Sequence, residues 1–424
     1  MSSFFSPLRI RFIMLLASGA VLYFFANVQR VAVPGAVFDR LQQLYNCDAS
    51  GIAALGMIFM YAYAIMQPLT GLFLDRFGSA RVLLAGGLIF CTGEFLFAGA
   101  ETLAAACIAQ LFNGLGAGAV YLALVRENMR IFRTKYNMTL AAIILIGYAG
   151  SVIANAPMLL LIERLGLQRV FFLSAWIIFF FWICCLLLIL RGSLQAERKN
   201  FRFSFREFVP VLHREHNRKL YLFSALNFGL YYVLQTVIGK KFLQDFCGVS
   251  DLSGGWIFSA TGAIAASGGF LFAALSTFTG NRRRIFCRIA GTVSLTVFAL
   301  FWGALWAGVR NGTFYTILFL VLSTTASLST IVIPLLRETN PEKIVGKSIS
   351  LLNFSFYLAV AVLGNFISLL LKCFVPVENH GVSVYGQGAW ITIFGVLFGI
   401  SFTVFYYSYQ MRETYGKYLQ KDFE

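Results

Sequence analysis

Long hydrophobic runs separated by short polar segments make up most of this chain. The runs have about 20 residues each, and few contain a charged residue. About 20 mainly apolar residues cross the ~30 Å hydrocarbon core of a membrane as a helix, and a helix satisfies its own backbone in lipid. The pattern predicts an all-α membrane protein with twelve transmembrane helices, at about 12–38, 50–74, 82–99, 102–125, 138–162, 170–190, 218–239, 254–278, 285–308, 314–336, 348–372 and 389–410.

The longest polar stretch, Arg191 to Lys219, divides these runs into two sets of six. Paired halves of this kind are typical of transporters. We therefore expect two pseudo-symmetric six-helix bundles joined by a basic cytoplasmic linker. The predicted parts are 1–191 (first bundle), 192–217 (linker) and 218–424 (second bundle and cytoplasmic tail).

Charge follows the loops. The chain has 34 Lys and Arg against 18 Asp and Glu, a net charge of +16, and most of the basic residues lie in alternate loops. This asymmetry is the positive-inside rule, and it accounts for the charge without nucleic-acid binding. We expect both termini in the cytoplasm and the protein in the inner membrane of a bacterium. A mean hydropathy of +0.76 excludes an ordinary soluble domain.

Signals of an enzyme are missing from the sequence. There is no phosphate-binding G-x-x-x-x-G-K-[ST] pattern and no catalytic constellation, and the eight cysteines lack metal-site spacing. We expect no cofactor and no metal. Cys47, Cys247 and Cys373 are placed outside, where a disulfide is chemically allowed, but the sequence does not pair them.

The loop Gly71-Leu-Phe-Leu-Asp75-Arg76-Phe-Gly78-Ser-Ala-Arg81 resembles the loop between the second and third helices of the major facilitator superfamily. An Asp/Arg cluster at a hairpin tip can form a charge-assisted latch, and the alternative is a plain cytoplasmic anchor. The predicted gating residues share this end of the bundle: Gly71, Asp75, Arg76, Gly78, Arg81, Arg126 and Glu127. The second half has a similar Gly280–Arg283 segment without the acid, so we expect an asymmetric gate.

Two further segments extend the resemblance. Ala26–Pro34 is similar to the first helix of organic-anion symporters and organophosphate exchangers, and Tyr61–Pro68 is similar to a branch that includes phagosomal amino-acid transporters. The resemblance implies that the first, fourth, seventh and tenth helices line a substrate cavity. Each carries polar residues at helical spacing, and the alternative for each residue is a hydrogen bond between helices. The predicted substrate-binding residues are Arg30, Asn27, Asn113, Tyr121, Asn227, Tyr231, Gln235 and Ser327.

Arg30 carries a charge deep in the first run. A charge there costs about 2.5–3.5 kcal/mol on insertion scales, and a bidentate guanidinium suits a carboxylate. We expect Arg30 to clamp an anionic group of the substrate, unless it snorkels to the outer surface.

Three residues differ from those of the related families; one difference bears on the substrate and two bear on proton coupling. Asn227 stands near the second arginine of organophosphate exchangers, so a monoanion or zwitterion suits the site better than a phosphate. Gln29 replaces an acid, and Gln110 replaces the arginine of the fourth helix, so the usual route of proton coupling is missing.

Glu94 is the one acid deep in a predicted helix. Burial disfavours the charged form of a carboxyl group, which suits a proton carrier. We expect Glu94 to act in coupling; the alternative is a structural, hydrogen-bonded acid.

The sequence thus predicts a monomeric secondary active transporter in membrane lipid. It moves a small organic solute, a carboxylate-bearing metabolite or an amino acid, by alternating access with cation (proton) symport. The alternatives are an anion exchanger or efflux transporter, and a membrane sensor that keeps the transporter fold.

Overall fold

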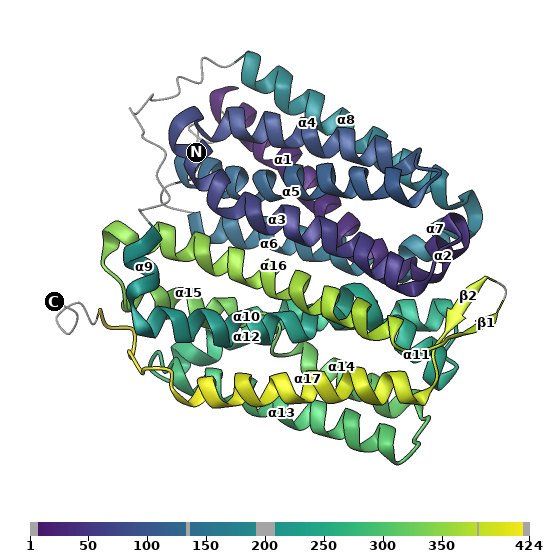
Figure 1. Ribbon diagram of the computed structural model, residues 1–424. Coiled ribbons are helices and arrows are strands. Elements are labelled where there is room, and N and C mark those ends of the chain that lie inside the picture. The colour runs from purple at the N-terminus through teal and green to yellow at the C-terminus, as the bar shows by residue number, and fades with distance from the viewer. Residues whose placement is uncertain (1–6, 133–135, 192–207, 380, 419–424) are drawn as a thin grey trace. The chain divides into compact units, whose positions relative to one another are not determined.

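The structure, a computed structural model, describes residues 7–132, 136–191, 208–379 and 381–418. Its elements are almost all helices (Figure 1). The first half contains α1 (Pro7–Val31), η1 (Ala32–Ala36), α2 (Phe38–Tyr45), α3 (Ala49–Phe77), α4 (Ser79–Ala98), α5 (Leu103–Ile131), α6 (Tyr136–Ile153), α7 (Ala156–Leu165) and α8 (Leu167–Leu190). The second half contains α9 (Val209–His213), α10 (Glu215–Val233), η3 (Leu234–Ile238), α11 (Gly239–Cys247), α12 (Asp251–Phe278), α13 (Arg284–Trp306), α14 (Gly312–Ser323), α15 (Ser329–Glu338), α16 (Glu342–Lys372) and α17 (Gln387–Tyr409), with a short antiparallel pair, β1 (Val377–Asn379) and β2 (Val382–Val384).

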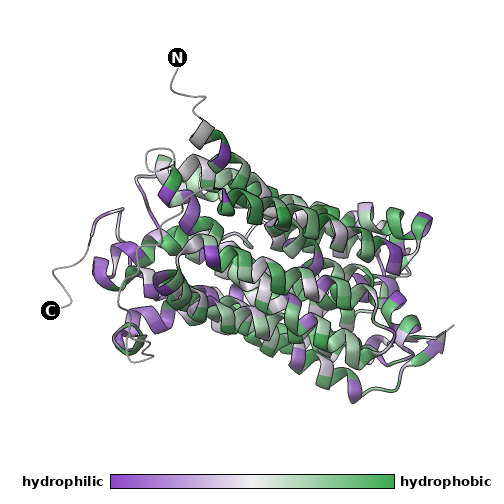
Figure 2. Cartoon of the chain, turned by 90° about the horizontal axis from the view of Figure 1, so that it is seen from above, coloured by the Kyte–Doolittle hydropathy of each residue, from purple (hydrophilic) through white to green (hydrophobic). Residues whose placement is uncertain are grey.

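Ten helices in the described part of the chain are long and apolar enough to cross a membrane. α6 and α7 are long and apolar enough only as a pair, and they are bent by 53° at a break just before Pro157; counted as one broken span, they make the eleventh. The expected run 314–336 is interrupted and forms two short helices, α14 and α15. Hydrophobic residues cover the lengths of the helices and hydrophilic residues gather near their ends (Figure 2). The protein is thus an all-α multi-pass membrane protein.

The helices group into two compact units. Unit 1 comprises residues 1–32 and 58–203, and unit 2 comprises 33–57 and 204–424. Residues 33–57 follow the first span in sequence but group with the second half. Of the expected linker, residues 192–207 lie outside the described part, and the remainder forms α9 and the start of α10.

Glycines allow α5 to approach two neighbouring helices in unit 1. A Cβ on Gly116 would lie 2.3 Å from the backbone nitrogen of Phe90 in α4. On the other face, a Cβ on Gly114 would lie 2.5 Å from the carbonyl oxygen of Phe59 in α3. Small residues that bring backbones together are a main means of packing helices in lipid.

Aromatic side chains fill the core of unit 2. The ring centroid of Phe242 in α11 lies 5.0 Å from that of Tyr315 in α14. It lies 5.3 Å from the ring centroid of Trp390 and 4.8 Å from that of Phe394, both in α17. Offset and edge-to-face rings stabilise a core beyond the area that they bury. This cluster anchors α11, which carries the charged residues described below.

Replacing Gly116 by Ala should destabilise unit 1, because the added methyl group meets backbone atoms that cannot rotate away. Overpacking of this kind costs about 1–3 kcal/mol. Gly303 of α13 is the matched control, since nothing lies within 4 Å of its added Cβ. There, alanine should stabilise the helix by about 1 kcal/mol. Thermal unfolding of both variants in detergent measures the difference, and equal shifts would contradict the packing.

Candidate functional site

The hairpin between α3 and α4 forms an ion pair with α5. Arg126 Nη2 lies 3.3 Å from Asp75 Oδ1, and both side chains are about half exposed. Gly78 makes the turn with a φ of 81°, which glycine adopts without strain. Arg126 is thus in contact with the predicted cluster, whereas the Arg76 guanidinium lies over the Phe77 ring, 5.1 Å from its centroid.

Glu127 was predicted to act together with the charged residues of the α3–α4 hairpin, but its partners are Ser79 and Arg130. Its side chain is fully buried, accepts a hydrogen bond from Ser79 and pairs with Arg130. It therefore ties the start of α4 to α5 from inside and does not contact the hairpin arginines. Arg81 forms no ion pair among the described residues.

The corresponding hairpin of unit 2 obtains its acids from elsewhere in the sequence. Arg283 Nη2 lies 3.0 Å from Glu338 Oε1 at the end of α15, and both side chains are buried. The carboxylate of Glu413 accepts from the backbone N–H groups of Arg283 and Arg284, at 2.6 and 3.1 Å. The Gly280–Arg283 segment lacks an acid of its own, which suggested an asymmetric gate. Glu338 and Glu413, which are distant in sequence, provide the acidic partners of this hairpin.

A charged cluster lies at the opposite end of unit 2, formed by α2, α11 and the start of α12. Its members are three cations and three carboxylates, Asp39, Arg40, Lys240, Lys241, Asp245 and Asp251. We call them the outer charge cluster, after the side on which the charge pattern of the sequence is expected to place them. The sequence predicted a loop at Lys240 and Lys241. Instead, the seventh span continues through η3 into α11, so both lysines lie in a helix.

The buried lysines are paired throughout this cluster. Lys241 Nζ lies 3.1 Å from Asp39 Oδ1 and 2.9 Å from Asp245 Oδ1, and its side chain is 2% exposed. Lys240 pairs with Asp251 and donates to the Ala36 carbonyl oxygen. Buried charges need such partners because desolvation is costly. The cluster joins 33–57 to α11 and α12.

Backbone packing reinforces this junction. A Cβ on Gly35 would lie 2.9 Å from the backbone carbonyl of Thr236, so η1 and η3 touch through their backbones. η1 is a kink, with a non-helical backbone at Val33, and η3 is a π-helical segment; both interrupt a long helix at a similar place in each half. π-Helical segments such as η3 often occur at functional sites.

Arg30 lies buried in unit 1, with 6% of its surface exposed. Its guanidinium donates to Asn27 Oδ1 and lies 5.6 Å from the centroid of the Tyr63 ring. Asn27 in turn donates to the Tyr23 carbonyl oxygen, at 2.8 Å. An aromatic face and an amide oxygen thus hold the cation, and this burial does not fit a side chain that snorkels.

A second polar group in unit 1 joins α1 and α5. Gln29 Nε2 donates to Gln110 Oε1 at 3.1 Å, and Asn113 Nδ2 donates to the same oxygen at 3.3 Å. All three side chains are at most 1% exposed. Gln110 Nε2 and Asn113 Oδ1 remain without hydrogen-bond partners. The sequence placed Gln29 and Gln110 as departures from a family pattern but did not predict their contact.

Glu94 of α4 is 1% exposed, and its Oε1 atom has no hydrogen-bond partner. A Cβ on Gly87, two turns earlier on the same face, would lie 3.2 Å from Leu22 Cδ1 of α1. Because Gly19 faces Leu83 in the same register, α1 and α4 run in the same direction. Two turns beyond Leu22 and Gly87 come Gln29 and Glu94. The unpaired carboxyl oxygen therefore lies at the level of the glutamine group.

The other predicted binding residues form hydrogen bonds and ring contacts within their own units. In unit 1, Tyr121 stacks on Tyr23, with ring centroids 4.9 Å apart. In unit 2, Gln235 donates to the Phe258 carbonyl oxygen at 3.1 Å, and Tyr231 donates to Gln235 at 3.4 Å. The Tyr121–Tyr23 and Gln235–Phe258 contacts are of the kind expected between helices, whereas Tyr231 and Gln235 lie four residues apart in one span.

Asn227 and Ser327 also bond neighbouring helices in unit 2. Ser327 donates to the Ala265 carbonyl oxygen at 2.5 Å, and Asn227 Nδ2 donates to the Thr325 carbonyl oxygen at 3.2 Å. Asn227 Oδ1 is buried without a hydrogen-bond partner.

Cys47, Cys247 and Cys373 are free thiols, so the structure contains no disulfide among them. Within the described residues, no group of three or more His, Cys, Asp or Glu side chains is arranged to hold a metal.

Replacing Lys241 by Met should destabilise unit 2 by about 3–5 kcal/mol, because Asp245 then stays buried without its cation. The double variant Lys241→Met/Asp245→Asn should recover part of this loss. Lys372→Met, at an exposed helix end, is the control. Denaturant unfolding in detergent measures all three, and a single variant as stable as the wild type would show that the pairing is unimportant.

We compared the sequence and the fold with those of known proteins. A sequence model of the Major Facilitator Superfamily matches residues 15–364. No curated protein matches the chain significantly. The fold is similar to a variant of the nucleoside transporter NupG, with 15% identity and a TM-score of 0.68 over 94% of this chain and 99% of that one. It is also similar to a variant of the peptide transporter POT, with 15% identity and a TM-score of 0.71 over 94% of each chain, and to that variant in complex with alafosfalin, with 14% identity, a TM-score of 0.68 and 94% of each chain covered.

The identities of 14–15% indicate a shared fold and leave the substrate open. The family model covers most of the sequence and agrees with the helical architecture. The chain therefore belongs to the major facilitator superfamily, whose members are secondary transporters of small solutes and not enzymes.

Proposed function

We propose that this protein transports a small carboxylate-bearing metabolite or an amino acid, with a cation as the coupling ion. The buried guanidinium of Arg30 is the observation that carries the proposal. A buried cation in a membrane helix marks a functional site by default, and the structure sets this guanidinium against the Asn27 amide and the Tyr63 ring. A substrate carboxylate supplies a charge complement with bidentate geometry.

Asn227 supports a substrate with a single negative charge. Related phosphate exchangers carry a second arginine near this place, but here the side chain is an amide whose Oδ1 lacks a partner. An amide oxygen accepts hydrogen bonds from an ammonium or hydroxyl group. Amino acids and hydroxy acids carry a carboxylate together with such a donor, whereas a phosphate dianion gains nothing from it.

Glu94 is the proposed coupling residue. A carboxyl oxygen buried without a partner has a large cost in its charged form, so the group gains from binding a proton. The neighbouring unpaired atoms of Gln110 and Asn113 provide a polar environment at the same level of unit 1. Protonation of Glu94 can therefore alter the hydrogen bonds around Gln29, the residue that precedes Arg30.

The ion pairs at the two ends fit gates for alternating access. At the inner end, Asp75–Arg126 joins the α3–α4 hairpin to α5. At the outer end, the outer charge cluster holds residues 33–57 against α11 and α12. We propose that the outer cluster breaks when the protein opens to the outside, and that the inner pair forms part of the opposite gate. In this proposal both termini are cytoplasmic and the protein acts as a monomer in the inner membrane.

Replacing Arg30 by Gln should reduce uptake of the carboxylate substrate about 10- to 100-fold, since a charge-assisted hydrogen bond contributes about 1.5–3 kcal/mol. Arg30→Lys should retain part of the activity, because it keeps the charge but loses the planar fork. Arg164→Gln, on an exposed face of α7, is the control. The measurement is initial uptake of labelled substrate into vesicles with equal protein content, and full uptake by Arg30→Gln would refute the clamp.

Replacing Glu94 by Gln should abolish accumulation against a gradient while leaving exchange of labelled for unlabelled substrate intact. The amide keeps the shape of the side chain but cannot carry the coupling proton. Glu101→Gln, exposed beyond the end of α4, is the control. Accumulation by Glu94→Gln at the wild-type level would rule out the coupling role, and counterflow in the wild type separates a transporter from a sensor that only binds.

A further inference from the structure

A basic cavity opens at the end of unit 2 where α10 begins and α17 ends. Its volume is about 330 Å³, at the lower end of the range for small-molecule sites. The lining residues come from α10, the end of α15 and the segment after α17: Arg214, Glu215, His216, Asn217, Lys219, Thr339, Gln410 and Arg412. None of them belongs to the proposed transport site.

The charge of this cavity is strongly positive. Three cations, Arg214, Lys219 and Arg412, line it together with one carboxylate, Glu215. Lys219 pairs with Glu215 at 2.6 Å, and Arg214 donates to the Thr339 carbonyl oxygen at 3.4 Å. Cations thus outnumber carboxylates among the residues that line the cavity, which favours an anionic occupant.

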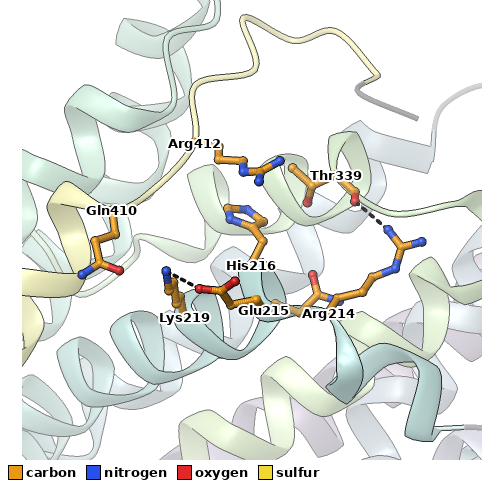
Figure 3. A pocket seen from close by; sticks show the side chains of 8 residues that line it. Arg214, Glu215, His216, Lys219, Thr339, Gln410 and Arg412 are labelled. Carbon is orange, nitrogen blue, oxygen red and sulfur yellow. Dashed lines mark hydrogen bonds and ion pairs between the residues drawn. The ribbon is translucent and has the colours of Figure 1, made fainter. Parts of the chain in front are cut away.

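His216 lines the cavity, and one nitrogen of its imidazole ring forms no hydrogen bond. It is 9% exposed, and its Nε2 atom has no hydrogen-bond partner. Figure 3 shows the imidazole between the Glu215–Lys219 pair and Arg412. A buried polar atom without a partner is costly, and a ligand oxygen in the cavity would remove that cost.

The backbone adds to the same preference. The 19-residue helix α10 begins at Glu215, and its N-cap residue, Arg214, makes no side-chain cap. The first N–H groups of a helix and its dipole favour an anion. The residues that line the cavity include the first three of α10, so these donors lie beside the cations.

We propose that this cavity is a binding site for a phosphate group, held by Arg214, Lys219, Arg412 and His216. Several donors converge on one small volume, which suits the three or more oxygens of a phosphate better than a single carboxylate. The phosphate belongs to either the headgroup of an anionic lipid or a soluble phosphate ester. The site lies where the candidate membrane helix α10 begins and α17 ends, and basic pockets at the ends of membrane helices bind lipid headgroups.

The test uses the full-length protein and the double variant Lys219→Gln/Arg412→Gln. Both side chains are at least one-third exposed, so the variant should fold. Arg282→Gln/Lys343→Gln removes the same charge from exposed positions at the same end and is the matched control. Thermal unfolding is measured in detergent with glycerol 3-phosphate, against chloride of equal ionic strength. It is measured separately in nanodiscs of phosphatidylcholine with and without phosphatidylglycerol.

Glycerol 3-phosphate or phosphatidylglycerol should raise the unfolding temperature of the wild type and of the control. Binding should weaken on the order of tenfold or more in the pocket variant, and His216→Phe should weaken it in the same direction. Stabilisation by the soluble ester identifies a metabolite as the source, and stabilisation by phosphatidylglycerol alone identifies a lipid. Arg30→Gln should keep this response, which separates the cavity from the transport site.

Two results would overturn the proposal. One is a wild-type protein that neither probe stabilises beyond chloride. The other is a control variant that loses the response as fully as the pocket variant, because general electrostatic attraction would then account for the binding.

Discussion

Lipid offers a buried polar group no hydrogen-bond partner, and this constraint governs the arrangement of polar side chains in both units. Most of them bond to backbone carbonyl groups, as Ser323 does to Phe319 and Ser327 to Ala265. Groups that keep an unpaired atom in the interior therefore stand out. Glu94, Gln110 and Asn113 do so at one level of unit 1, next to the turn of α1 that carries Arg30.

The same constraint explains why the two halves form similar contacts from different residues. In unit 1, Ser79 at the start of α4 bonds to Glu127 near the end of α5. In unit 2, Arg283 before α13 bonds to Glu338 at the end of α15. Both acids follow an arginine, Arg126 near the end of α5 and Arg337 near the end of α15. A buried acid at this place fixes each hairpin, whichever donor faces it.

The sequence predicted features that depend on local spacing. The helical class and the closeness of Asp75 to the α5 end follow from hydrophobic length and motif, and the structure agrees. Contacts between distant helices were not predictable, because no spacing encodes them. Gln29 meets Gln110 across 81 residues, and Arg283 meets Glu338 across 55. Lys240 and Lys241 resembled loop residues because two of their acidic partners, Asp251 and Asp39, lie in other segments. Together with Asp245 in the same helix, these acids allow the charged stretch to remain helical and buried.

The central claim is that Arg30 recognises a carboxylate. Binding is its most direct test, because a ligand that binds the native state raises the unfolding temperature by mass action. The measurement is a thermal-shift screen of the purified protein against amino acids, hexuronates, other monocarboxylates, sugar phosphates and neutral sugars. The account predicts stabilisation by a carboxylate that disappears in Arg30→Gln. Stabilisation by neutral sugars alone, or by a carboxylate to the same degree in Arg30→Gln, would contradict it.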